Sequence, residues 1–387
     1  MNIMFVWDSP GVGGVQTVTE FLANRFVKDS HNVTILFLWG GDPMYATNFD
    51  KNVDIRYGEC KKISTWNINL TRQLVKEKGI DVIINQMGGN VYFARTLYKA
   101  TKELNTKIIA VYHNAPDYNT RLHRATLELE NATSLCTKML HSLKKAVVKK
   151  ATSRMMRYSY NHSDYFMLLS EKFITSFSQF TKIKTPRKIL VINNPTTKKR
   201  EDITTDIRKE KLIIYVGRLE ESQKRFSRVL EIWKEVSPLI PEWQLSIVGD
   251  GPDKRKYEEY VRINNLVNIV FEGFRNPVDF YERASMLLLT SDYEGWPLVL
   301  CEGMCYGCVP VLLASFKSCY EIVENNRNGI ILEMPFCVDD WKDKIVQLTN
   351  SPSLLKELSE NAIQDSKRFD IETIYNQWIT TLNKILR

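Results

Sequence analysis

The chain has 387 residues, of which 44% are hydrophobic and 25% are charged, and its formal net charge is +8. These fractions are ordinary for a soluble globular protein and exclude a disordered or fibrous chain. No apolar run approaches the ~20 residues that cross a bilayer, and the length predicts two domains of roughly 100–200 residues each.

The beginning of the chain predicts a strand over residues 3–7, a glycine-rich loop from Asp8 to Gln16, and then a helix. We expect no secretory signal, because the apolar start has no preceding cations and no small-residue cleavage site. Glycines in the loop let the backbone approach a ligand closely. A dinucleotide-binding motif would need a third glycine where Gln16 stands, so a nicotinamide enzyme is a poor match.

Short apolar strands alternate with amphipathic helices along the rest of the chain. This alternation predicts an α/β fold with parallel sheets. The predicted strands of the first half are 3–7, 33–39, 81–85, 107–112, 165–169 and 189–193, and those of the second half are 212–216, 244–248, 268–271, 286–290, 309–313 and 329–332. Predicted helices include 16–28, 65–77, 226–236, 252–263 and 371–386.

A polar segment with a proline, residues 193–202, separates the two series of strands and is a candidate linker. We therefore predict a first domain over 1–195 and a second over 196–370, with the helical segment 371–387 packing back on the first. Doubly wound sheets bind ligands outside the carboxyl ends of their strands, so the expected site is a cleft between two facing sheets.

One segment of the first half, residues 131–163, contains no Asp or Glu but seven Lys and Arg residues. Apolar residues recur within it at roughly helical spacing. One interpretation is a basic amphipathic helix that binds anionic lipid or another polyanion, through a surface that includes Lys144, Lys145, Lys149 and Lys150. The other is a solvated charged face over an ordinary core stripe.

Four of the seven cysteines lie between residues 301 and 319. We interpret Cys301, Cys305 and Cys308 as small buried thiols that pack a helix against a sheet, and not as metal ligands. No histidine follows residue 162, so this cluster lacks a common partner for a metal site. Free thiols suit a reducing cytosol, where we expect the protein to reside.

Two loops of the second half carry the residues for a candidate site. The predicted strand 212–216 leads into Gly217 and Arg218, and Lys224 stands just before the next helix. Two cations at the start of a helix can neutralise a diphosphate, although isolated cations are more often ordinary surface charges.

The second loop follows strand 286–290 and holds Glu294 and, eight residues later, Glu302. Pro297 suits the first position of a helix, whose free Leu298 and Val299 amides would favour an anion. One segment thus offers amides for a phosphate and carboxylates for hydroxyl groups.

In order and spacing, these segments resemble the retaining GT-B glycosyltransferases of family 4. The resemblance rests on Val-Gly-Arg-Leu at 216–219 with Lys224, Ile-Val-Gly-Asp-Gly-Pro at 247–252, Phe-Glu-Gly-Phe at 271–274, the Glu294–Glu302 segment, and Gly-Met-Cys-Tyr-Gly-Cys-Val-Pro-Val at 303–311. The first half adds Gly-Gly-Val at 13–15 and Val-Tyr-His-Asn at 111–114. The implied fold is two Rossmann-like domains that face each other across a cleft.

The resemblance also implies a role for each residue. The implied catalytic set is His113, Arg218, Lys224 and Glu294, and the implied donor-binding set is Gly13, Gly14, Gly217, Gly273, Pro297, Leu298, Val299 and Glu302. Arg218 and Lys224 would neutralise the donor diphosphate, Glu302 would bind the ribose, and His113 would reach the sugar near its anomeric carbon.

The implied reaction transfers a sugar with retention of configuration from a nucleotide-sugar, with a UDP-sugar expected, to a glycan or lipid-linked glycan in polysaccharide or lipopolysaccharide biosynthesis. No cofactor and no metal is expected, and the sequence has no Asp-x-Asp pair. We expect a cytoplasmic protein, peripheral on an anionic membrane, that binds no nucleic acid. The alternatives are a nucleotide-sugar epimerase of similar fold and a non-catalytic module that binds a polyanion or a membrane.

Overall fold

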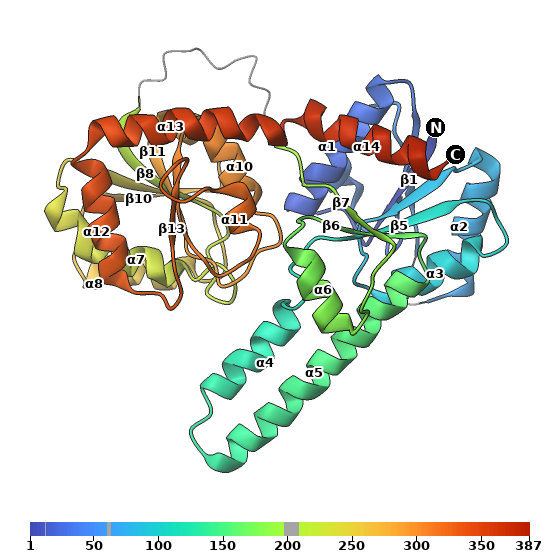
Figure 1. Cartoon of the computed structure of the whole chain (residues 1–387), viewed down its shortest axis with the longest axis horizontal. Helices are drawn as coiled ribbons and strands as arrows, with labels where there is room; N and C mark the ends of the chain where they lie inside the picture. Colours follow the sequence, from blue (N-terminus) through green and yellow to red (C-terminus); the bar gives the residue numbers. More distant parts are fainter. Residues whose placement is uncertain (12, 60–62, 197–208) are drawn as a thin grey trace. The chain divides into compact units, whose positions relative to one another are not determined.

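The computed structural model of the chain describes residues 1–11, 13–59, 63–196 and 209–387. The chain forms two compact units, Met1–Thr197 with Ile371–Arg387 and Lys198–Asp370 (Figure 1). Residues 197–202 of the predicted linker and Val12 of the glycine-rich loop lie outside the described residues.

The first unit contains a parallel sheet whose seven described strands follow the order β3-β2-β1-β4-β5-β6-β7. The strands are β1 Asn2–Trp7, β2 Asn32–Phe37, β3 Asp54–Tyr57, β4 Val82–Asn85, β5 Lys107–Tyr112, β6 Tyr165–Leu168 and β7 Ile189–Val191. The strand order reverses between β1 and β4. In open sheets of this kind, ligands bind outside the carboxyl ends of the strands at that reversal.

The helices of the first unit are α1 Gly14–Lys28, α2 Thr65–Lys78, α3 Val91–Thr101, α4 Thr120–Glu130, α5 Leu135–Asn161, α6 Phe173–Thr181 and α14 Ile371–Ile385, with a short 3₁₀ turn η1 at Pro43–Ala46. The last helix packs on the first. The Tyr375 ring meets the Phe26 ring edge-on at 5.1 Å, and Arg25 Nη2 donates to Glu372 Oε2 at 2.8 Å. Helix α14 therefore belongs to the first unit although it ends the chain.

The second unit contains a parallel sheet whose six described strands follow the order β10-β9-β8-β11-β12-β13. The strands are β8 Glu210–Val216, β9 Gln244–Val248, β10 Ile269–Gly273, β11 Ala284–Leu289, β12 Val309–Leu313 and β13 Ile330–Leu332. The helices and 3₁₀ turns are α7 Phe226–Val236, η3 Ser237–Leu239, α8 Lys254–Ile263, α9 Val278–Arg283, α10 Leu298–Cys305, α11 Cys319–Ile322, α12 Val338–Thr349, α13 Pro352–Ser366 and η4 Lys367–Phe369. Here the strand order reverses between β8 and β11.

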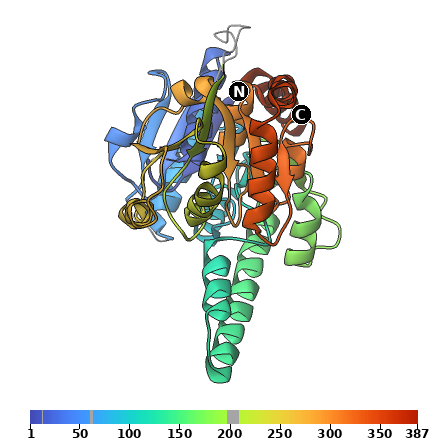
Figure 2. The ribbon, with the colours of Figure 1, turned by 90° about the vertical axis from the view of Figure 1, so that its left-hand side faces the viewer.

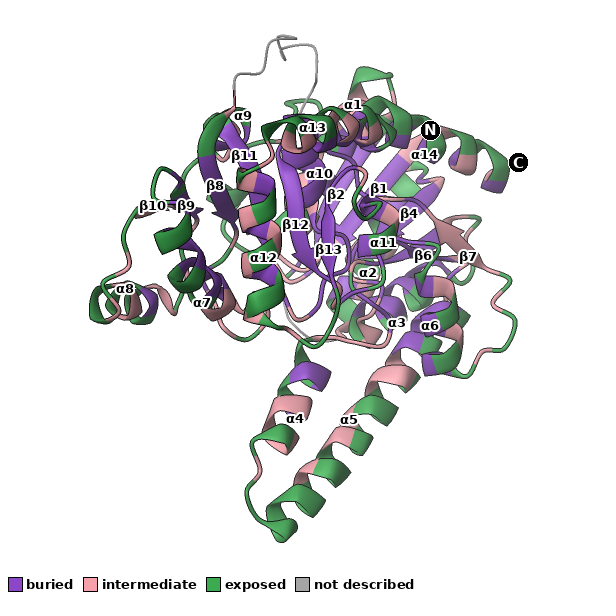
Figure 3. Ribbon diagram, turned by 60° about the vertical axis from the view of Figure 1, so that its left-hand side comes forward, coloured by how far each residue is buried: buried purple, intermediate pink, exposed green. Residues whose placement is uncertain are grey.

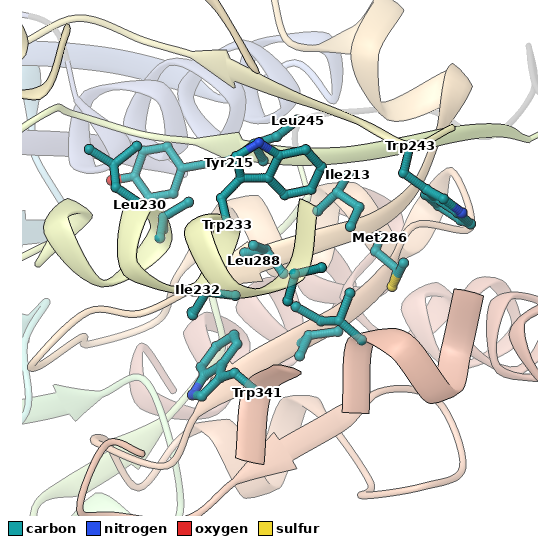
Figure 4. Packing of buried hydrophobic residues seen from close by; sticks show 14 of the residues in the cluster. Ile213, Tyr215, Leu230, Ile232, Trp233, Trp243, Leu245, Met286, Leu288 and Trp341 are labelled. Atoms are coloured by element: carbon teal, nitrogen blue, oxygen red, sulfur yellow. The ribbon is translucent and has the colours of Figure 1, made fainter. Parts of the chain in front are cut away.

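The core of the second unit fixes α7 against the sheet. Trp233 lies beside Ile213 and Tyr215 in Figure 4, and its indole N–H donates to the carbonyl of Val267 at 2.8 Å. Phe226, the first residue of α7, is fully buried and lies 4.8 Å from the Tyr215 ring. This packing positions the loop that precedes α7, which carries Lys224.

All twelve predicted strands are present, and their ends differ by at most about two residues from the predicted ones. Parallel strands are covered on both faces, so each is a short apolar run that a sequence pattern reveals. The pattern missed β3, whose residues Asp54 to Tyr57 carry charges and which lies at the edge of its sheet.

The cysteines that we interpreted as packing residues are buried and free of disulfides, and Cys301 and Cys308 are completely inaccessible to solvent. Burial raises the pKa of the Cys301 thiol well above its ordinary value. Within the described residues, no group of three or more His, Cys, Asp or Glu side chains is placed to hold a metal ion.

Helices α4 and α5 pack along each other as a hairpin that extends away from the sheet of the first unit (Figures 1 and 2). Most of its outer part is exposed, as Figure 3 shows. Leu135, Met139 and Leu143 are 87%, 79% and 64% exposed. The interpretation of this stripe as ordinary core is therefore wrong for these residues.

Candidate active site

The candidate site of the second unit is built by the two loops at its strand-order reversal. Strand β8 pairs directly with β11 in parallel, so the segments that follow them lie side by side. The segment after β8 runs from Gly217 to Arg225, and the segment after β11 runs from Thr290 to Pro297. Each contributes one member of a charged pair.

Lys224 and Glu294 form this pair. The Lys224 ammonium nitrogen lies 2.7 Å from Glu294 Oε1, and the two side chains are only 18% and 8% exposed. An ion pair so poorly exposed to water interacts more strongly than one on the surface. An anionic ligand that approached the Lys224 ammonium would compete with the Glu294 carboxylate for it.

A second set of ionic contacts, which the sequence did not predict, fixes this loop. Asp292 accepts from Arg225 Nε at 2.7 Å and lies 2.7 Å from Arg228 Nη1, and its own N–H donates to the carbonyl of Gln223 at 2.8 Å. Arg225 has a φ of 47°, an uncommon conformation for a residue with a side chain. Arg225 directly follows Lys224 and Asp292 lies two residues before Glu294, so their nearness to predicted site residues was the available signal.

Glu302 lies inside α10 and is 8% exposed. The phenol of Tyr281 donates to Glu302 Oε2 at 3.1 Å. Burial, together with this carboxylate, raises the pKa of Tyr281 well above its ordinary value. Tyr281 therefore remains a hydrogen-bond donor that orients the carboxylate at neutral pH.

Helix α10, which contains Glu302, begins at Leu298, with Pro297 at the capping position and not inside the first turn as predicted. The amides of Leu298 and Val299 have no intrahelical carbonyl available to them, because they precede the first complete turn. Leu298 and Val299 are half-buried. This helix start has the amide groups and the dipole that favour an anion.

Arg218 is more exposed than the pair. Its side chain is 59% exposed, and its Nε lies 2.9 Å from Glu220 Oε2. The phenol of Tyr215 donates to the Arg218 carbonyl at 3.1 Å, which holds the backbone of this residue. The structure thus joins Lys224 with Glu294, and it pairs Arg218 with Glu220.

Glycines shape the floor of these loops. A Cβ atom added to Gly249, which has a φ of 148°, would lie 2.0 Å from the Gly217 carbonyl oxygen. The loop after β8 therefore passes Gly249 at a distance that no other residue permits. Gly273 ends β10 with a φ of 73°, and its carbonyl accepts from the Gly249 N–H at 2.8 Å.

The first unit has a cavity of about 800 Å³ at its own strand-order reversal. A cavity of this size is typical of a small-molecule site. Residues after β1, β4 and β5 and on α5 line it, among them Trp7, Asp8, Gln86, Met87, His113, Asn114, Thr152 and Met155.

His113 is held in one orientation on the wall of this cavity. Its Nε2 lies 2.7 Å from Gln86 Oε1, and the Gln86 amide nitrogen donates to Thr19 Oγ1 at 3.0 Å. The amide oxygen must accept, so His113 Nε2 carries the proton. Burial lowers the pKa of His113 to about 4, so the ring is neutral at physiological pH.

Gly13 and Gly14 also line the cavity, at the N-terminus of α1. Gly13 caps the helix without a side chain, and a Cβ atom there would meet nothing within 4 Å. Gln16 is buried, and its amide accepts from the Gly11 N–H at 2.5 Å and donates to Glu20 Oε1 at 2.6 Å. Gln16 stabilises the loop here, where a dinucleotide fold would have a third glycine.

The four lysines predicted as a membrane or acceptor surface all lie on α5. Lys149 and Lys150 are exposed, Lys145 is half-buried, and Lys144 lies 2.6 Å from Glu128 of α4. None of the helices in the described ranges is both long enough and apolar enough to cross a membrane.

Two family models match the chain, and each covers somewhat less than half of it. The model of Glycosyltransferase Family 4 matches residues 12–200, and that of Glycosyl transferases group 1 matches residues 197–365. Together they span both units.

Relatives and solved structures extend over the whole chain. An uncharacterized glycosyltransferase of Haemophilus influenzae is 26% identical over 380 residues, 97% of each protein. A Campylobacter jejuni α-1,4-N-acetyl-D-galactosaminyltransferase that acts on a GalNAc-containing undecaprenyl diphosphate is 22% identical over 388 residues, 100% of this chain and 99% of that one. The crystal structure of HepE from Anabaena in complex with UDP and glucose has a TM-score of 0.76 at 15% identity and covers 99% of this chain and 100% of that chain.

Proposed function

We propose that this chain, which belongs to the group 1 and family 4 glycosyltransferases and has the GT-B fold, transfers a sugar from a nucleotide-sugar to a glycan acceptor with retention of configuration. The observation that carries the proposal is the Lys224–Glu294 pair at 2.7 Å, beside the start of α10. A diphosphate has the charge to replace the carboxylate beside Lys224.

Transfer breaks the bond between the anomeric carbon and the β-phosphate oxygen of the donor. Negative charge then develops on the leaving diphosphate, and preplaced cations and amides that meet this charge lower the barrier. Lys224 and the amides of Leu298 and Val299 supply such groups. Arg218, whose side chain is 59% exposed, supplies a second cation that can reorient toward a ligand.

Two cations and a helix start can provide the neutralisation that a divalent metal gives in other transferases, so we propose a reaction without a bound metal or cofactor. In the retaining mechanism that the family resemblance implies, the departing phosphate accepts the acceptor's proton on the same face of the sugar. No general base and no covalent enzyme intermediate is needed. Neutral His113 suits this scheme as a hydrogen-bonding group and not as an acid.

Glu302 suits the ribose of the nucleotide, because a carboxylate accepts hydrogen bonds from hydroxyl groups and the Tyr281 phenol orients this one at 3.1 Å. We propose a UDP-sugar as the donor, supported by the UDP and glucose in the HepE structure. The 800 Å³ cavity of the first unit suits the acceptor. A lipid-linked glycan acceptor and a role in surface polysaccharide synthesis are supported by the Campylobacter relative, which acts on such a substrate.

A donor screen tests the proposal: release of nucleotide from UDP-, GDP- and ADP-sugars, with and without a lipid-linked glycan. Lys224→Ala should slow transfer by about three orders of magnitude, which corresponds to about 4 kcal/mol of transition-state stabilisation. Lys234→Ala is the matched control, since Lys234 is an exposed lysine on α7. A normal rate for Lys224→Ala would remove Lys224 from the mechanism.

Three further readouts separate the finer points. The anomeric proton coupling of the product, measured by NMR, distinguishes retention from inversion. Activity that survives a chelator supports a metal-independent reaction, and activity that is lost and then restored by a divalent ion contradicts it. Incubation with donor alone tests the epimerase alternative, because an epimerase would convert the sugar without an acceptor.

A further inference from the structure

The α4–α5 hairpin, called the arm below, carries an apolar stripe that the rest of the described chain does not cover. Leu135, Met139, Leu143 and Val147 recur at every fourth position of α5, so they lie along one face of the helix. Their exposed fractions range from 87% at Leu135 to 59% at Val147. A contiguous exposed apolar stripe of this kind marks an interaction surface.

The contacts of the arm place α4 on a different side of α5. Glu128 of α4 lies 2.6 Å from the Lys144 ammonium and 3.6 Å from His141 Nδ1. His141 precedes Leu143 by two positions, so the two side chains point about 160° apart around the helix. The second helix of the arm therefore leaves the apolar stripe open.

Cations continue the same face toward the body of the first unit. Lys150, Arg154 and Arg157 lie three, seven and ten residues after Val147, and all three are exposed. Helix α5 contains no Asp or Glu, so no acid of its own neutralises them. One face of α5 is thus apolar toward the tip and cationic toward the base.

The geometry points to an anionic lipid leaflet as the occupant of this face, with the apolar stripe at the boundary of headgroups and acyl chains and the cations against lipid phosphates. A basic helix with an apolar face binds membranes in this manner. The α5 helix of a second copy would cover the stripe, but it contains no Asp or Glu to neutralise Lys150 and Arg154. A nucleic acid would satisfy the cations but would leave the leucines in water.

The inferred membrane surface adds to the proposed function. Its consequence for the acceptor rests on that proposed function. Thr152, Met155 and Met156 at the base of α5 line the 800 Å³ cavity. Val147 and Thr152 are five residues apart, which is about 7.5 Å along a helix. An arm docked on a leaflet would therefore hold the cavity close to the surface from which a lipid-linked glycan projects.

Vesicle sedimentation of the full chain, without nucleotide-sugar, tests the arm separately from catalysis. The vesicles are phosphatidylcholine alone, or phosphatidylcholine with 30% phosphatidylglycerol. We expect the chain to bind the anionic vesicles about tenfold more tightly than the neutral ones, and high salt to weaken that binding. Equal binding to both vesicles, or no binding to anionic vesicles at low salt, overturns the inference.

Two arm variants divide the surface into its parts. The first variant, Met139→Gln with Leu143→Gln, removes apolar area and keeps the helix, because Gln is a good helix former. The second variant, Lys149→Gln, Lys150→Gln and Arg154→Gln together, removes charge. Each should weaken binding to anionic vesicles about tenfold or more. The matched control, Lys76→Gln, Arg95→Gln and Lys99→Gln, removes the same charges from exposed positions on α2 and α3 and should change binding less than twofold.

Circular dichroism of each variant verifies that the helices are retained. Sedimentation velocity provides the competing outcome. If the chain is a dimer that Met139→Gln with Leu143→Gln converts to a monomer, the stripe binds a second copy and the lipid assignment is wrong. If the arm variants bind vesicles as the unmodified chain does, the arm is not the lipid-binding surface, whatever the outcome of the glycosyl transfer assays.

Discussion

Glu294 lies 2.7 Å from the Lys224 ammonium, where the proposed donor diphosphate would bind. Replacing Glu294 with Gln should therefore strengthen the binding of UDP itself, even though it removes a predicted catalytic group. The pair is 18% and 8% exposed, so an effective dielectric constant of about 20 is appropriate. A carboxylate about 6 Å from a unit of phosphate charge then opposes binding by about 3 kcal/mol.

Solvent that enters with the ligand and the dipole of the introduced Gln amide reduce the gain in binding free energy, so we expect a gain of about 1.4 kcal/mol. That is about a tenfold lower Kd for UDP. Isothermal titration calorimetry at fixed ionic strength measures it. Sugar transfer by the same variant should be slower, because the family resemblance implies that Glu294 lies by the donor sugar. Tighter nucleotide binding with slower transfer separates this role from simple damage to the fold.

A double-variant cycle sharpens the test. If Glu294 opposes UDP only by occupying Lys224, the gain from Glu294→Gln should vanish when Lys224 is already Met, whereas direct repulsion between the carboxylate and the phosphate predicts that the gain persists. Glu235→Gln is the control, since Glu235 is an exposed acid on α7 and its loss should leave the Kd unchanged within about twofold. UDP binding by Glu294→Gln that is equal to or weaker than that of the unmodified chain would contradict this prediction, because the pair would then not face the diphosphate.

Three other expectations concern the surroundings of the site. Asp292→Ala should destabilise the second unit by about 2 kcal/mol and lower kcat/KM about tenfold, because Arg225 loses the carboxylate that holds its φ of 47°; urea unfolding and steady-state kinetics measure the two effects. His113 has a folded pKa of about 4 against 6.5 unfolded, so the unfolded chain binds more protons between these values. The neutral His113 ring should therefore contribute about 3 kcal/mol to the free energy of unfolding above pH 6.5, and this contribution should be lost as the pH falls toward 4. Denaturant midpoints across that range, compared with those of His113→Gln, would reveal the loss. Gly249→Ala should cost on the order of 3 kcal/mol and weaken UDP binding, because its Cβ would lie 2.0 Å from the Gly217 carbonyl; a melting temperature and UDP Kd equal to those of the unmodified chain would contradict this close approach.

Local sequence patterns were sufficient to predict the α/β architecture. The run Leu212–Val216 is buried from end to end, as parallel strands between two layers of helices are, so its apolar letters alone identify a strand. The same holds for the loop around Glu294, because a strand end, a proline and a helix start are local features. Strand β3 was missed because its short, charged segment gains its hydrogen bonds only from β2.

Contacts between distant residues required the tertiary structure. Lys224 and Glu294 are 70 residues apart, and only the pairing of β8 with β11 brings them within 2.7 Å. The anchoring role of Asp292 and the proton position on His113 likewise depend on partners that spacing does not specify. For α5, the sequence was sufficient to predict an amphipathic basic helix. An apolar stripe that packs on a core and one that is left exposed have the same helical spacing in the sequence. Only the packing of α4 on another side, with Leu135 left 87% exposed, shows that this stripe does not face a core.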